Sequence, residues 1–296
     1  MLVGLGGYAI GYDIFEGNIY EGHTLIPTLI KFEKRFNLTK PIVDADAGLL
    51  STANIKLLEQ NNYQYILGAR PKNESNEVKK KILQRVLEDG QTMLIQKTAE
   101  SRLIIAYSNK RAAKDEHNRE RGLQRLEKKI KSGKLTKSNI NNKGYNKYLK
   151  IKGEVNVEID YERFNQDKSW DGLKGYLTNT KLNANTIIEN YKNLWQIEKA
   201  FRISKTDLRI RPIFHRLRSR IEAHICIAFT AYSIYKELKR ILHKEKAPFS
   251  VKTAAELTHT IYQIKVVLPD TKKQENILLK MDDKQTTLSK IITKYL

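Results

Sequence analysis

Tyr191, Glu198 and Lys205 are separated by two steps of seven residues, and Arg202 follows Glu198 by four. If this segment is a helix, these side chains project from nearly one line of its surface. The stretch 199–220 holds eight cations and one acid, Asp207. The cations are Lys199, Arg202, Lys205, Arg209, Arg211, Arg216, Arg218 and Arg220. A lone carboxylate in such a row is typical of a ligand for a divalent metal whose neighbours bind a nucleic-acid backbone. An exposed ion pair of Glu198 with Arg202 or Lys205 is the alternative explanation.

Asp46 is the second candidate ligand, because it follows an apolar segment and precedes the small residues Ala47 and Gly48. Two divalent cations about 4 Å apart can activate the attacking oxygen of a phosphodiester reaction and stabilise the leaving oxygen. Carboxylates at strand ends suit such cations, because a rigid sheet fixes their separation. Asp44 points to the same face by the two-residue period of a strand. Capping of a turn explains an aspartate at position 46 equally well.

The composition favours a polyanionic partner. The chain has 296 residues, is 40% hydrophobic and carries a formal charge of +21. Nucleic acid is the expected partner, and an anionic membrane surface is the competitor. No segment reaches the roughly 18 apolar residues of a membrane span, and no leader opens the chain, so we expect a cytoplasmic protein without a membrane partner. The single cysteine, Cys226, excludes a disulfide within one chain and is expected to be buried.

The pattern of apolar residues predicts an α/β protein. Residues 1–15 indicate two short strands joined by a Gly-Gly turn, and 23–36 a helix. A buried strand at 40–46, a helix at 51–60 and a strand at 63–69 complete a sheet with at least one parallel crossover. These elements predict a first domain over residues 1–70.

The rest of the chain divides by its character. Residues 71–180 indicate a β-rich, basic insertion, with strand-like runs at 92–97, 102–107 and 155–161, a helix at 119–134 and a loop at 132–148. From Lys110 to Lys152 there are 15 basic and 4 acidic residues, which indicates either a solvated face or phosphate contacts. Residues 181–245 are helical up to a break near Pro212, with 221–241 as a buried core helix. Residues 246–296 indicate a helical tail with one short strand at 264–268.

Three segments together resemble bacterial insertion-sequence transposases of the DDE type. They are Ile10-Gly-Tyr-Asp-Ile-Phe-Glu-Gly-Asn18 with His23-Thr-Leu-Ile-Pro27, Ile42-Val-Asp-Ala-Asp-Ala-Gly-Leu-Leu-Ser51, and Trp195-Gln-Ile-Glu-Lys-Ala-Phe-Arg-Ile-Ser-Lys205. More narrowly, the chain resembles the IS-four-like group, whose signature is Tyr, two residues, Arg, three residues, Glu, six residues, Lys. Tyr191, Glu198 and Lys205 match this signature, and Leu194 stands where it has Arg.

The resemblance implies a ribonuclease-H-like catalytic fold with a β-rich insertion and a helical C-terminal part. It implies that Asp46 and Glu198 are catalytic ligands of two Mg²⁺ or Mn²⁺ ions. Tyr191 and Lys205 carry over as the signature's tyrosine near the site and its phosphate contact, and the neighbouring Arg202, Arg209 and Arg211 are expected to bind DNA as well. The implied partner is double-stranded DNA, as transposon ends and target, and the resemblance leaves open a homodimer in the DNA complex.

The first aspartate of the family lies on the first strand of its fold, and no Asp precedes Asp13 in this chain. We therefore expect a fold lacking its first strand, a truncated transposase and no activity of the chain alone. A catalytically dead DNA-binding remnant is one alternative. A basic structural protein associated with RNA is another, and it would prefer structured RNA to DNA.

Overall fold

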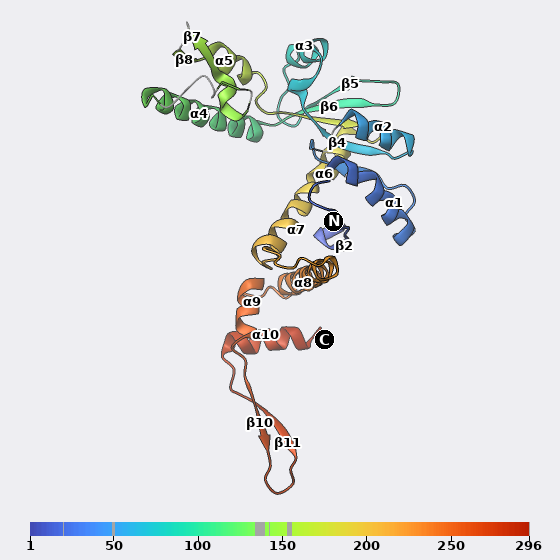
Figure 1. Ribbon diagram of the computed structural model, residues 1–296, viewed down its shortest axis with the longest axis vertical. Helices are drawn as coiled ribbons and strands as arrows, with labels where there is room; N and C mark the ends of the chain where they lie inside the picture. Colours follow the sequence, from blue (N-terminus) through green and yellow to red (C-terminus); the bar gives the residue numbers. More distant parts are fainter. Residues whose placement is uncertain (20, 49–50, 134–139, 142, 153–155, 296) are drawn as a thin grey trace. The chain divides into compact units, whose positions relative to one another are not determined.

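The computed structural model describes residues 1–296 except 20, 49–50, 134–139, 142, 153–155 and 296 (Figure 1). The chain divides into two compact units, each described here by itself. The first, unit 1, contains residues 1–16 and 195–296, and the second, unit 2, contains residues 17–194. Across the described part of the chain, no helix combines the length and the apolar character needed to cross a membrane.

A five-stranded mixed sheet forms the centre of unit 2, in the order β3-β4-β9-β6-β5. The strands are β3 Val43–Ala45, β4 Tyr65–Ala69, β5 Thr92–Gln96, β6 Arg102–Tyr107 and β9 Leu173–Thr178. β3 and β4 are parallel, and the other neighbouring strands are antiparallel. The predicted α/β class and the parallel crossover are confirmed. The predicted strands 92–97 and 102–107 join the same sheet as β3 and β4, whereas the described part of the predicted strand 155–161 belongs to a separate two-stranded sheet.

Helices cover both faces of this sheet because its strands are apolar on both sides. On one face, α1 Leu25–Phe36 and α2 Thr52–Gln60 pack on Val43, Ala45 and Leu67. Ser51 caps α2 by accepting a hydrogen bond from the backbone N–H of Asn54, as its position predicts. On the opposite face, α6 Ala184–Lys192 places Ile187 against Ile66, Ile104 and Tyr176. Short 3₁₀ turns lie at Glu21–Thr24 and Pro71–Asn73.

The rest of unit 2 surrounds two smaller cores. The helix α3 Asn76–Gln84 packs on β5 and β6 through Ile82, Met93 and Leu103. The second core joins the elements α4 Asn109–Lys131, the 3₁₀ turn Gly144–Tyr148, β7 Leu149–Lys152, β8 Asn156–Ile159 and α5 Tyr161–Lys168. Its buried residues are Leu126, Tyr148, Leu149, Ile159 and Phe164.

The sequence predictions for this second core hold in part. The helix α4 begins ten residues before the predicted start at 119, because the polar stretch after Ser108 continues as helix. Parts of the predicted loop 132–148, namely 134–139 and 142, lie outside the described residues, as does the predicted strand residue Val155.

In unit 1, a short hairpin packs on two helices. The strands β1 Leu2–Val3 and β2 Ala9–Gly11 pair antiparallel, joined by the 3₁₀ turn Leu5–Gly7, which confirms the predicted hairpin. The helices α7 Leu194–Thr206 and α8 Arg218–Lys244 contact it through a shared core. That core contains Ala200, Ile203 and Tyr232, with Met1, Val3 and Ala9 packed against it.

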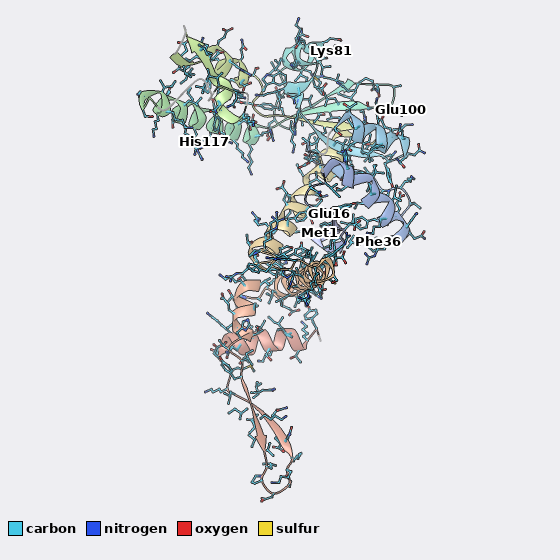
Figure 2. The ribbon with its side chains drawn as sticks, in the orientation of Figure 1. Met1, Glu16, Phe36, Lys81, Glu100 and His117 are labelled. Carbon is cyan, nitrogen blue, oxygen red and sulfur yellow. The ribbon has the colours of Figure 1, made fainter. Side chains whose placement is uncertain are left out.

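The C-terminal part of unit 1 contains α9 Val251–Thr258, β10 Gln263–Val267, β11 Gln274–Leu278 and α10 Asp283–Thr293. Leu242, Val251, Ala254 and Leu288 form the core between α8, α9 and α10. The strands β10 and β11 form an antiparallel hairpin that extends away from α9 and α10, with side chains projecting on both sides (Figures 1 and 2). The sequence predicted the first of these strands and missed the second.

Two predictions about the long helices are wrong. Residues 221–241 are not a buried core helix, because Ile227 and Ile234 are 71% and 64% exposed and the face bearing Cys226 is exposed too. Only one stripe of α8 packs on α7 and the hairpin, so apolar composition did not translate into burial. The helix that carries Glu198 is not continuous with Tyr191 either, since α6 ends at Lys192 and α7 begins at Leu194.

Candidate active site

Asp46 lies at the carboxyl end of β3, directly after the buried Ala45. Its side chain is exposed, and Oδ1 accepts a hydrogen bond of 2.8 Å from the backbone N–H of Gly48. This is the turn contact that the sequence offered as an alternative to metal binding. The contact uses one lone pair of one oxygen, and a carboxylate has about four acceptor sites. Asp46 can therefore stabilise the turn and still present an oxygen to a cation.

Asp44 lies on the same strand, two residues before Asp46. Asp44 is in register with Ile66 on β4, and the side chain of Ile66 belongs to the core beneath α6. The Oδ1 atom of Asp44 is buried and has no hydrogen-bond partner among the described residues. Burial raises the pKa of Asp44 to about 6, because the charged form loses its hydration. The alternation of the strand thus gives two carboxylates on one face, one exposed and one buried without a partner.

Tyr191 reaches this same end of the sheet from α6. Its ring packs edge-on against Tyr176, with ring centroids 5.0 Å apart. Its hydroxyl lies over Gly68 on β4, where an added Cβ would collide with the hydroxyl and would come 3.0 Å from the backbone nitrogen of Ala47. The absence of a side chain at Gly68 therefore lets the Tyr191 hydroxyl lie beside the residue that follows Asp46.

Two cations at this edge were missed by the sequence analysis. Arg70 follows β4 and donates a hydrogen bond of 3.0 Å to the carbonyl of Ala47. Lys174 is the second residue of β9, and its Nζ lies 4.1 Å from the centroid of the Tyr191 ring. Arg70 had a local signal, because it directly follows an apolar strand. Lys174 had none, since only the antiparallel pairing of β4 with β9 brings it here.

Glu198 lies in unit 1, on the exposed side of α7. Lys205 is on the same helix two turns later, and the break at Asn193 separates both from Tyr191. The structure gives Glu198 no ion pair with Arg202, with Lys205 or with any other residue that it describes. The exposed ion pair that the sequence allowed as an alternative is therefore not found.

The cations that follow Glu198 are almost free of carboxylate partners. Of the eight between 199 and 220, only Arg218 forms an ion pair with a described residue, 2.9 Å from Glu222 and 4.0 Å from Glu16. Arg209 and Arg211 are exposed in the segment between α7 and α8. This segment is fixed at Ile210, whose N–H donates to the Ser204 carbonyl at 3.0 Å and whose carbonyl lies 3.0 Å from Nε2 of His224. The guanidinium groups are thus held on an anchored backbone, with their charges unneutralised.

The candidate residues thus fall into two groups. Asp46, Tyr191, Arg70 and Lys174 lie at one edge of the sheet in unit 2. Glu198, Arg202, Lys205, Arg209 and Arg211 lie in unit 1. No group of three His, Cys, Asp or Glu residues that could hold a metal ion exists within the described part of the chain. The available donors are nevertheless carboxylate oxygens, the ligands that Mg²⁺ and Mn²⁺ prefer.

Comparison with known proteins gives one result. A family model described as "Transposase DDE domain" matches residues 1–234. This range includes both β3 with Asp46 and α7 with Glu198. No curated protein matches the chain. No solved structure matches it either.

Proposed function

This chain belongs to the transposase DDE domain family, and from that membership we propose that it is a DNA transposase that cleaves and joins strands at the ends of a mobile element. More narrowly, we place it in the IS-four-like group, with a ribonuclease-H-like catalytic fold. In this proposal residues 1–70 are the first part of the catalytic core, 71–180 an insertion, 181–245 the helices that complete the core, and 246–296 a tail. A cytoplasmic location and the pairing of two copies on DNA stay predictions.

The observation that carries the proposal is the state of its two acidic residues. Asp46 is exposed at a strand end with coordination sites to spare, and Glu198 is exposed on a helix without an ion pair among the described residues. Both carboxylates therefore keep oxygens free to bind a cation. We assign both as ligands of two Mg²⁺ or Mn²⁺ ions, which when bound would supply the activation of the attacking oxygen and the stabilisation of the leaving oxygen.

The cations of the two units have a separate role. Arg202, Lys205, Arg209 and Arg211 present charge without carboxylate partners, which supports contacts to the phosphates of DNA. At the sheet edge, the ring of Tyr176 and the ammonium group of Lys174 pack against the Tyr191 ring and place its hydroxyl beside Ala47, so it can hold a phosphate or a water at the end of β3. These residues bind and orient the strand, and the carboxylates act on it.

The test is an assay of strand cleavage and joining on duplex DNA that carries the ends of the element, with Mg²⁺ or Mn²⁺. We compare the parent chain with Asp46→Asn, with Glu198→Gln and with a matched control, Glu256→Gln. Glu256 is an exposed glutamate on α9, 3.9 Å from Lys252. If the parent cleaves, against the expected inactivity of the chain alone, each of the first two variants should lower cleavage at least 100-fold with unchanged DNA binding, and the control should behave like the parent.

Three results would count against the proposal. Cleavage that survives both Asp46→Asn and Glu198→Gln would remove these residues from the site. DNA binding without cleavage by the parent, with either metal, would make the protein a DNA-binding remnant. Tighter binding of structured RNA than of DNA would favour an RNA-associated protein instead.

A further inference from the structure

A second group of cations lies where α7 packs on α8, within unit 1. The contact is made by Ala200 and Ile203 of α7 with Tyr232 of α8, and Tyr235 packs against the same core. Lys199 adjoins Ala200 in sequence. On α8, Lys236 and Lys239 are three residues apart, a spacing that places both on one face. All three lysines are partly buried.

The charges of the three lysines act on one another, and no described carboxylate forms an ion pair with any of them. Lys239 acts most strongly on Lys199, and Lys236 and Arg202 are close enough to act on its charge as well. Two lysine ammonium groups have six donors and no acceptor, so they cannot satisfy each other. The contact with Lys239 is the largest cause of a lowered pKa of Lys199, ahead of burial. Burial, followed by the charge of Lys239, lowers the pKa of Lys236.

Two acids on or beside these helices, Glu237 and Asp207, are engaged elsewhere, and Glu198 forms no ion pair with a described residue. Glu237 accepts hydrogen bonds of 3.0 Å and 2.5 Å from Arg240 and one of 2.9 Å from the Tyr8 hydroxyl. Asp207 accepts from the Thr206 hydroxyl at 3.0 Å and interacts with Tyr235. No described carboxylate forms an ion pair with Lys199, Lys236 or Lys239. The charge of this cluster is therefore not neutralised by any carboxylate that the structure describes.

The backbone holds part of the cluster in place. Nζ of Lys236 donates a hydrogen bond of 2.6 Å to the carbonyl of Gly6, in the turn between β1 and β2. A Cβ at Gly7 would come 3.0 Å from the same Nζ, and φ at Gly7 is +81°, a conformation that favours glycine. The turn therefore approaches Lys236 closely and fixes this cation of the cluster.

We propose that Lys199, Lys236 and Lys239 form a phosphate-binding cluster that grips one backbone phosphate of the DNA bound by this protein. A phosphodiester oxygen accepts several donors at once and supplies the negative charge that the three ammonium groups lack. The cluster is distinct from Arg202, Lys205, Arg209 and Arg211, because two of its members come from α8. The inference rests on the proposed function, since it takes DNA as the ligand.

The test is the salt dependence of DNA binding. The affinity for a fluorescent duplex is measured across a range of NaCl concentrations for the parent and for Lys199→Gln, Lys239→Gln, Lys239→Arg and Lys284→Gln. Lys284 is an exposed lysine of α10, so its variant removes the same charge away from the cluster. The slope of log K against log salt is negative, and loss of one phosphate contact reduces its magnitude by about 0.9. We expect this decrease for Lys199→Gln and Lys239→Gln, and an unchanged slope for Lys239→Arg and Lys284→Gln.

Equal slopes for Lys239→Gln and Lys284→Gln would overturn the inference. A second measurement, hydrogen exchange of the α7 and α8 amides with and without inorganic phosphate, shows whether the cluster binds a free anion. Protection by phosphate together with equal slopes would mean that the cluster binds a free anion and not DNA. A parent chain that binds no duplex DNA would instead overturn the proposed function. The two failures are therefore distinguishable.

Discussion

Two charged clusters of this protein differ in whether their charges are neutralised by neighbouring side chains. In unit 2, Asp167 of α5 accepts hydrogen bonds from Lys72 at 2.9 Å, from the Tyr148 hydroxyl at 2.7 Å and from Lys147. In unit 1, Lys199, Lys236 and Lys239 gather without a carboxylate among them. The first cluster is neutralised by its own residues. The second is not.

This difference distinguishes charges that stabilise the fold from charges that are available to bind a ligand. Burial alone raises the pKa of Asp167, but the hydrogen bonds from Lys147, Tyr148 and Lys72 outweigh it and lower the pKa to about 2. A closed network of this kind stabilises the fold and has no need of a ligand. An open cluster destabilises the free protein and is relieved when an anion binds. The formal charge of +21 therefore indicates a polyanionic partner mainly where cations have no carboxylate partner among the described residues, as on α7 and in the segment between α7 and α8.

The largest expected effect comes from opening the closed cluster. Asp167→Ala leaves Lys72 and Lys147 facing each other beside Tyr148, so we expect unit 2 to lose about 2 to 3 kcal/mol of stability. Hydrogen exchange of the amides of α5 and of the turn before β7 measures this loss. Glu77→Ala is the control, because Glu77 pairs with Lys81 at 2.7 Å on an exposed helix face and should change stability little. Equal effects of the two variants would show that the Asp167 network is no more than a surface ion pair.

The second-largest expected effect is the pH dependence of the stability that Asp167 contributes. The pKa of Asp167 falls from an ordinary 3.8 to about 2 in the folded state. A lowered pKa means that the stabilisation is present above about pH 4 and is lost as the pH falls through 2. We expect a loss of about 1 to 2 kcal/mol after allowance for solvent screening. Urea denaturation between pH 5 and pH 2 should show the difference between the parent and Asp167→Asn shrinking over this range. A difference that stays constant would contradict the assigned pKa.

The smallest effect has the opposite sign. Lys239→Gln removes one of the like charges, so the contact of α7 with α8 should gain a few tenths of a kcal/mol in the absence of DNA. Slower hydrogen exchange of the α8 amides at low salt would reveal it. Added salt should erase the difference, because salt screens exposed charges. Faster exchange in Lys239→Gln would mean that Lys239 supports the fold and would end the contrast between the two clusters.

Much of the sheet could be predicted because its signals are local. The apolar segments that became β3 and β4, the Ser51 cap of α2 and the strand period that places Asp44 with Asp46 all depend on neighbours within a few residues. Asp46 was predicted as a ligand because it follows such a strand. Glu198 was predicted as a ligand because it is a lone acid in a row of cations at helical spacing.

The errors share one cause, which is that burial depends on distant residues. Cys226 was expected in a core, but it is exposed on α8, because the packing of that helix is set by residues far away in the sequence. The places of Lys174 and Tyr191 at the end of β3 follow from strand pairing and helix packing across more than 100 residues of chain. The second strand of the C-terminal hairpin, Gln274–Leu278, is polar and exposed, so its pattern resembled a loop.

The sequence by itself determined the charge, the family signature and the local elements, because these depend on residue type and on spacing within one helix or strand. Only the tertiary structure decided which charges are neutralised. Asp167 meets cations from two other segments, Glu198 meets none among the described residues, and Lys199 meets two lysines from the next helix. The reason is that Coulomb energy depends on distance in space, and folding alone sets that distance.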